Sequence, residues 1–78
     1  MKFDFSAVFA EGQRVRYLCD RSKGAIHRGE EGTVVSVLPE TKSLGVDWDR
    51  TDPARHDCCG KARDGHGWYV YMTHVTLI

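Results

Sequence analysis

Short stretches of the chain alternate apolar and polar residues, and a period of two is typical of strands with one buried face. The stretches that alternate most clearly or are richest in β-branched residues are 13–19, 32–38, 44–49 and 68–72. Residues 72–75 have the length of a single tight helical turn, and residues 75–78 predict a last short strand. No long helical periodicity is present. The pattern therefore predicts an all-β fold, a small and strongly bent five-stranded barrel with a single 3₁₀ turn before the last strand.

The inward positions of these strands predict the core of the domain. Bulky apolar side chains that share the inward phase contribute about 1.5–3 kcal/mol each when they are buried. The residues expected in the core are Val15, Tyr17, Val34, Val46, Trp48, Trp68, Val70 and Leu77. Cys19 also lies on the inward face of its strand, and we expect a small core residue there rather than a reactive thiol.

Three other segments precede or separate the predicted strands. Residues 1–11 contain three phenylalanines and form an N-terminal arm ahead of the barrel at 12–78. The arm either covers one end of the barrel or packs against a second copy of the chain, which would make a homo-oligomer. Residues 39–43 begin with proline and predict a hairpin turn. Residues 50–66 lack apolar periodicity, and a loop of this length in a compact domain is usually functional or disordered.

Size and composition limit the functions that the chain can have. Seventy-eight residues make one small domain, without room for a bulky catalytic cavity. Eleven basic and eleven acidic residues cancel, so the whole molecule has no general attraction to nucleic acid or to an anionic membrane. An odd number of cysteines, three, together with no signal-peptide pattern and no long apolar run, predicts a reduced, cytoplasmic protein that does not insert into a membrane.

The charges are unevenly distributed along the sequence. Between residues 14 and 28 there are five basic residues and one acid, whereas acids outnumber bases between residues 30 and 57. We therefore expect an electrically two-sided domain. Its secondary basic patch would consist of Arg14, Arg16, Arg21, Lys23 and Arg28.

Residues 56–70 gather histidines, cysteines, glycines and aromatic residues in one loop and its exit. The candidate ligands of a zinc ion are His56, Cys58, Cys59 and His66, completed by Cys19 or His74. Their spacing differs from the paired knuckles of familiar zinc sites, so we expect no metal and no cofactor. We expect instead that both histidines hydrogen-bond to loop backbone and that Cys58 packs at the edge of the core. A cysteine nucleophile would need an orienting partner and an oxyanion site, which so small a barrel rarely provides, so we do not expect an enzyme.

Two parts of the sequence resemble a known fold. Gly-Glu-Glu-Gly-Thr-Val-Val-Ser-Val at 29–37, followed after a turn by Gly-Val-Asp-Trp-Asp at 45–49, resembles the core of KOW-type and other SH3-like barrels. Residues 67–78 are similar to the strand, 3₁₀ turn and short strand that close SH3 folds. The resemblance covers residues 13–78 and implies an SH3-like barrel. The acidic loop and paired tryptophans of peptide-binding SH3 domains are absent, so binding of proline-rich peptides is not expected.

A narrower similarity lies in His-Asp-Cys-x-Gly at 56–60 and Asp-Gly-His-Gly-Trp-x-Val at 64–70. This signature resembles small SH3-like proteins that are encoded by bacteriophages and prophages. Cys59 is a departure, because a glycine is expected at its position. The resemblance implies a phage-related protein that acts in the cytosol of a bacterial host, and it implies no particular biochemical activity.

These observations favour a non-enzymatic binding protein whose partner is a host or phage protein, for which the resemblance suggests an inhibitor of a bacterial defence or host enzyme. Small barrels present loops and an edge strand, and aromatic and arginine side chains make good interface anchors. The expected binding residues are Arg55, His56, Lys61, Arg63, His66, Tyr69 and Tyr71. One alternative is a barrel that binds nucleic acid or a nucleotide through basic and aromatic residues. A second alternative is a small zinc-binding module.

Overall fold

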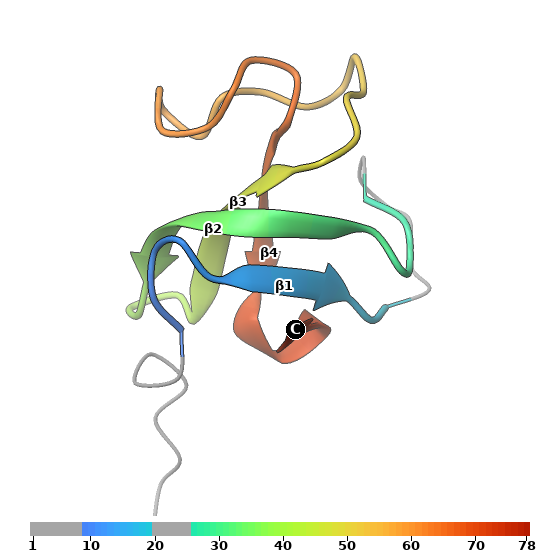
Figure 1. Cartoon of the computed structure of the whole chain (residues 1–78). Coiled ribbons are helices and arrows are strands. Elements are labelled where there is room, and N and C mark those ends of the chain that lie inside the picture. The colour runs from blue at the N-terminus through green and yellow to red at the C-terminus, as the bar shows by residue number, and fades with distance from the viewer. Residues whose placement is uncertain (1–8, 20–25) are drawn as a thin grey trace, which may run out of the picture.

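A single antiparallel sheet organises the computed structural model, which describes residues 9–19 and 26–78 (Figure 1). The elements in chain order are β1 (Arg14–Tyr17), β2 (Glu31–Leu38), β3 (Ser43–Trp48), β4 (Gly67–Tyr71), the 3₁₀ helix η2 (Met72–His74) and β5 (Val75–Leu77). The strand order is β4-β3-β2-β1-β5, so β4 and β5 are the two edges. The prediction of an all-β, five-stranded fold with one 3₁₀ turn before the last strand is confirmed. The described residues contain no helix that is both long and apolar enough to cross a membrane.

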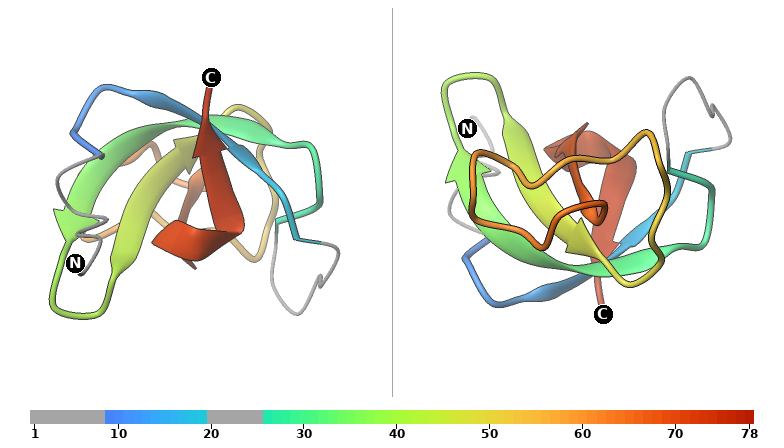
Figure 2. Two further views of the ribbon diagram at one scale, coloured as in Figure 1. Left: turned by 90° about the horizontal axis from the view of Figure 1, so that it is seen from below. Right: turned by 90° about the horizontal axis from the view of Figure 1, so that it is seen from above.

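The sheet is strongly bent, and β2 is the long strand that connects its two halves (Figure 2). β2 pairs with β1 near its start and with β3 along its length. The register with β3 shifts between Val34 and Ser36, and such a bulge increases the local bend and twist of a strand. Near the start of β2, a Cβ atom on Gly32 would lie 2.7 Å from the carbonyl oxygen of Asp47. Only glycine therefore allows β2 to approach β3 this closely.

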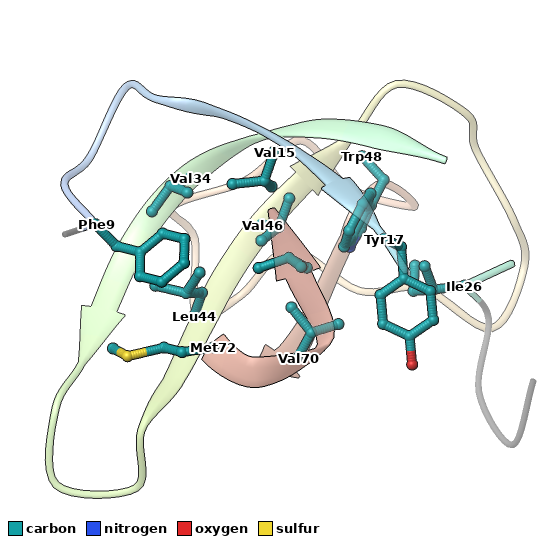
Figure 3. Close-up of a cluster of buried hydrophobic side chains, with 11 residues drawn as sticks. Phe9, Val15, Tyr17, Ile26, Val34, Leu44, Val46, Trp48, Val70 and Met72 are labelled. Carbon is teal, nitrogen blue, oxygen red and sulfur yellow. The ribbon is translucent and has the colours of Figure 1, made fainter. Parts of the chain in front are cut away.

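The core lies on the concave side of this sheet, where apolar side chains from all five strands converge (Figure 3). Six of the eight predicted core residues are buried, and Trp68 is partly buried against them. The prediction for Leu77 is wrong, since this side chain is 38 % exposed on the short edge strand β5, which has a strand on one side only. Cys19 packs against the core as expected. The core also includes Leu44, which lies on the inward face of the same alternating strand as Val46, and four residues that were not predicted, namely Phe9, Ile26, Met72 and Val75.

The segment before β1 covers one end of the core. Phe9 is buried in the core cluster, and the chain that follows it is attached to β2 by two hydrogen bonds. The N–H of Gly12 donates to the carbonyl oxygen of Val34 at 2.8 Å, and the N–H of Val34 donates to that of Gln13 at 2.8 Å. The described end of the predicted arm thus packs on its own barrel. Residues 1–8 lie outside the described residues, and a homo-oligomer formed through them stays a prediction.

Candidate functional site

The irregular loop from residue 49 to residue 66 lies at one end of the sheet, between β3 and β4 (top of Figure 1). Its two ends are held together by backbone hydrogen bonds. The N–H of Trp48 donates to the carbonyl oxygen of His66 at 2.9 Å, and the N–H of Asp52 donates to that of Gly65 at 3.1 Å. The side chain of His66 adds a further contact, because its Nδ1 lies 2.7 Å from the carbonyl oxygen of Trp48. A carbonyl oxygen only accepts, so Nδ1 of His66 carries a proton and donates it.

His56 fixes the middle of the loop to the edge of β4. Its backbone forms an isolated antiparallel bridge with Gly67, with N···O distances of 2.9 and 2.6 Å. Its ring Nδ1 accepts a hydrogen bond from the N–H of Cys58 at 2.9 Å. The ring centroid also lies 5.5 Å from those of Trp68 and Tyr69. The prediction that the histidine rings hydrogen-bond loop backbone is therefore confirmed for His56, whereas the backbone partner of the His66 ring belongs to the end of β3.

The two adjacent cysteines form the centre of a tight turn. Cys58 and Cys59 have φ angles of 48° and 59°, and the carbonyl oxygen of Asp57 accepts from the N–H of Gly60 at 3.0 Å. Two central residues with positive φ are typical of a type I′ turn, in which glycine or asparagine is preferred. For other residues, the left-handed backbone conformation costs about 1–2 kcal/mol per residue. Glycine would therefore be favoured over cysteine at both central positions of this turn.

The environments of the two cysteine thiols differ. Cys58 is fully buried, as predicted for a residue at the core edge, and burial raises the pKa of its thiol. Cys59 is exposed, and the hydroxyl of Tyr69 donates to its Sγ at 3.6 Å. This hydrogen bond, with some desolvation, raises the pKa of Tyr69 to about 12. Cys58 is therefore poorly suited to be a nucleophile, because the reactive thiolate is disfavoured and covered.

Arg55 does not lie on the surface, although the sequence analysis placed it among the binding residues. Its side chain is 2 % exposed, and its Nη2 lies 2.7 Å from both carboxylate oxygens of Glu30. Its Nη1 also donates to the carbonyl oxygen of Arg50. The guanidinium therefore joins the loop to the residue that precedes β2 and is not available to a ligand. Sequence reasoning missed this ion pair, since the two residues are 25 positions apart.

The other basic residues of the loop remain at the surface, but one of them is held by an acid. The Nη2 of Arg63 lies 2.8 Å from Oδ1 of Asp47, and its backbone N–H donates to the same carboxylate at 3.0 Å. These hydrogen bonds lower the pKa of Asp47 below its usual range. Lys61 is exposed. Of the three predicted loop cations, the structure thus leaves Arg63 and Lys61 at the surface.

The predicted secondary basic patch is divided by neighbouring acids. On β1, Arg14 makes a two-pronged contact with Asp49, and one of its nitrogens lies 2.7 Å from Oδ1. This contact lowers the pKa of Asp49. Arg16 pairs with Glu31 on β2 at 3.0 Å. The pairing of strands therefore brings acids of the 30–57 stretch against β1, and the expected separation of charge is not found there. Arg28 is exposed, and Arg21 and Lys23 lie outside the described residues.

The outer face of β2 and β4 carries three large exposed side chains, two of which lie in the row of Ser43 at the hairpin end of the sheet. Leu38, Tyr69 and Tyr71 are 37, 37 and 58 % exposed. They border a groove of about 400 Å³ that is lined by Leu38, Thr41, Ser43, Tyr69, Val70 and Tyr71. The two tyrosines were predicted as binding residues, whereas the three residues from β2, the hairpin and the start of β3 were missed. Leu38 could have been found, because it follows the alternating part of its strand directly before the hairpin turn.

The groove exists because small residues of β3 lie between larger ones. The register places Ser43 between Leu38 and Tyr71, and the next row places Gly45 beside Tyr69. A Cβ atom on Gly45 would lie 3.0 Å from the Tyr69 ring, so the ring covers this glycine. On the outer face, the small residues of β3 therefore form the floor of the groove, and the larger side chains of β2 and β4 form its two walls.

The candidate zinc ligands are only partly brought together. His56, Cys58 and Cys59 are neighbours in one turn, but Nδ1 of His56 already accepts from backbone. Within residues 9–19 and 26–78, no three histidine, cysteine, aspartate or glutamate side chains are grouped so that they could hold a metal ion. Comparison of the chain with models of protein families and with curated protein sequences gives no match.

Proposed function

We propose that this chain is a non-enzymatic, phage-related binding protein whose partner is a host or phage protein. The observation that carries the proposal is the apolar groove between Leu38, Tyr69 and Tyr71. Aromatic side chains are enriched among the residues that supply most of the binding energy at protein interfaces. The phage relation rests on the resemblance of the loop signature, which also makes inhibition of a bacterial defence or host enzyme the expected role.

The cysteines and histidines of the loop support a binding protein rather than an enzyme. The Cys58 thiol is buried with a raised pKa. Nδ1 of His56 and Nδ1 of His66 are both engaged with backbone groups. These side chains are thus used to shape the loop, and a nucleophile with an orienting base is not assembled from them.

The distribution of charge favours a protein over a nucleic acid or a nucleotide. The guanidinium groups of Arg14, Arg16 and Arg63 face carboxylates within hydrogen-bonding distance, which reduces their attraction for phosphate. A second groove of about 410 Å³ beside Arg28 is also lined by Glu31 and other acids. If nucleic acid were the partner, binding to a generic oligonucleotide would be submicromolar and steeply salt-dependent. Changing Arg14 or Arg16 to alanine would then each reduce the salt slope by about one.

The test is a pulldown from nuclease-treated bacterial lysate with matched surface variants. One bait is the wild-type chain, the second carries Leu38→Ser and Tyr71→Ser in the groove, and the control carries Leu77→Ser and Ile78→Ser. The control residues are 38 and 50 % exposed at the opposite edge, so the two double variants remove comparable apolar surface. We expect a stoichiometric protein partner with the wild type and the control. The groove variant should bind that partner roughly tenfold more weakly or worse, equivalent to about 1.4 kcal/mol.

Two results would contradict the proposal. Retention of the partner by a folded groove variant would place the binding surface elsewhere. Absence of any stoichiometric protein, together with salt-sensitive oligonucleotide binding, would favour the nucleic-acid alternative. The zinc alternative has its own readout, since one zinc per purified chain and unfolding by a chelator would support it.

A further inference from the structure

The edge of β4 has backbone groups that face away from the sheet. The N–H of Met72 donates to the carbonyl oxygen of Lys42 at 2.8 Å, so Met72 and the residues two and four positions before it face β3. Inward-facing and outward-facing residues alternate along an antiparallel strand. Tyr69 therefore directs its N–H and C=O to the outer edge, and Tyr71 directs its N–H there. None of the residues in 9–19 and 26–78 pairs with these three groups.

The same edge already accepts one short antiparallel partner from the loop. At the start of β4, the backbone of His56 exchanges two hydrogen bonds with Gly67. The pairing does not extend to Tyr69, because the chain reaches His56 from a turn in which the N–H of Arg55 donates to Asp52 at 3.0 Å. The Arg55 side chain is directed into the interior toward its buried carboxylate partner. Tyr69, the next outward-facing residue of β4 after Gly67, therefore has no partner strand among the described residues.

The exposed rings of Tyr69 and Tyr71 lie beside this open position. Tyr69 and Tyr71 project from the outer face of β4, and the groove extends from them over Ser43 toward Leu38. A strand added next to β4 would place every second side chain on this face. Main-chain hydrogen bonds and alternate side-chain pockets are the two elements of recognition by strand addition. Here the outward backbone groups supply the first element, and the exposed rings of Tyr69 and Tyr71 supply apolar surface for the second.

We propose that the partner contributes an extended segment that adds to β4 as an antiparallel strand in line with His56. The segment pairs with the outward backbone groups of Tyr69 and Tyr71 and places apolar side chains, at alternate positions, against the exposed rings of these two tyrosines. This inference rests on the proposed function and specifies how a protein partner is recognised. An apolar segment fits this site better than a phosphorylated one, because the side chains beside the outward backbone groups are the rings of Tyr69 and Tyr71.

The decisive experiment removes one outward N–H and keeps every side chain. Cys59 allows the protein to be made by native chemical ligation. Residues 1–58, prepared as a C-terminal thioester, react with a synthetic peptide of residues 59–78 that begins with Cys59 and has an N-methylated Tyr69, and the product has an ordinary peptide bond between residues 58 and 59. N-methylated Leu77 is the matched control, because the N–H of Ile78 donates to Arg14 at 3.1 Å and the alternation directs that of Leu77 to the outer edge of β5. The probes are peptides selected against the wild-type chain from a library of random twelve-residue peptides displayed on phage.

We expect the selected peptides to carry apolar or aromatic residues at alternate positions. They should bind the N-methyl-Tyr69 protein roughly tenfold more weakly than the wild type, and bind the N-methyl-Leu77 protein within about twofold of it. In the wild type, peptide binding should slow hydrogen exchange at the Tyr69 amide. This measurement tests the inference even if N-methylation at Tyr69 prevents folding.

Three outcomes would overturn the inference. The first is equal binding by both N-methylated proteins, and the second is unchanged exchange at the Tyr69 amide when peptide is bound. The third is dimerisation of the wild type that N-methylation of Tyr69 abolishes, since a second copy would then occupy the edge. Failure here leaves the pulldown unaffected, because a partner that is lost on mutation of Leu38 and Tyr71 could contact the groove through a folded surface.

Discussion

The ion pair between Arg55 and Glu30 has the largest expected effect on stability, because it is buried and joins the irregular loop to the residue that precedes β2. The two side chains are 2 and 6 % exposed. Glu30 accepts from Arg55 through both carboxylate oxygens at 2.7 Å, and its Oε2 also accepts from the N–H of His27 at 2.8 Å. Replacing Arg55 with alanine removes the cation and leaves the carboxylate buried.

The expected loss of stability is a large part of the total. Removing one partner of a buried ion pair destabilises by about 3–5 kcal/mol, because the remaining charge is uncompensated. At roughly 0.05–0.15 kcal/mol per residue, a chain of this length has a free energy of unfolding of about 4–12 kcal/mol. The melting temperature of Arg55→Ala should therefore fall by about 12–40 °C, or the protein should not fold at all.

Thermal and urea unfolding, followed by circular dichroism, measure this effect. The matched control is Arg16→Ala, which also removes an arginine from an Arg–Glu pair, but one whose side chains are 47 and 37 % exposed. Surface pairs contribute about 0–1 kcal/mol, so the control should stay close to the wild type. A double variant, Glu30→Met with Arg55→Met, should recover much of the stability that Arg55→Ala loses, since neither charge is then buried alone.

Two results would refute this reasoning. Equal stability of Arg55→Ala and the wild type would mean that the guanidinium is exposed to water in solution. A double variant as unstable as Arg55→Ala would mean that the loss comes from packing or from loop distortion rather than from the unpaired charge of Glu30.

Three further predictions concern the core, the thiols and the pH dependence. Val46→Asp should abolish the native circular dichroism spectrum, because Val46 is fully buried in the sheet centre; a native spectrum would contradict the strand phase. A disulfide reagent should label Cys59 in the native protein but Cys58 only after unfolding, as mapped by peptide mass spectrometry; equal labelling rates would contradict the burial that raises the Cys58 pKa. The pKa of Asp47 is lowered in the folded state, so its contribution to stability is present above the usual value near 3.8 and is lost as the pH falls through the folded pKa. In Arg63→Ala, acid titration of the unfolding free energy should therefore show a shallower decline over that range; an unchanged decline would exclude the ion pair as its cause.

The sequence by itself determined the strands, the hairpin and most of the core, because these depend on neighbours within a few residues. The alternation at Val15 and Tyr17 and at Val46 and Trp48 correctly identified their buried faces. The turn after Pro39 followed from the fixed backbone angle of proline. The histidine and cysteine loop was also correctly located, including its attachment to backbone.

Only the tertiary structure decided which charged and apolar groups meet. No local pattern distinguishes Arg55 from the exposed Lys61, because its burial depends on Glu30, 25 positions away on another segment. The exposure of Leu77 depends on strand order, since β5 is an edge. The groove beside Tyr71 likewise requires the register of three strands, which a one-residue bulge in β2 shifts. Register and strand order are set by packing across the whole sheet, and so the alternation within one strand cannot specify them.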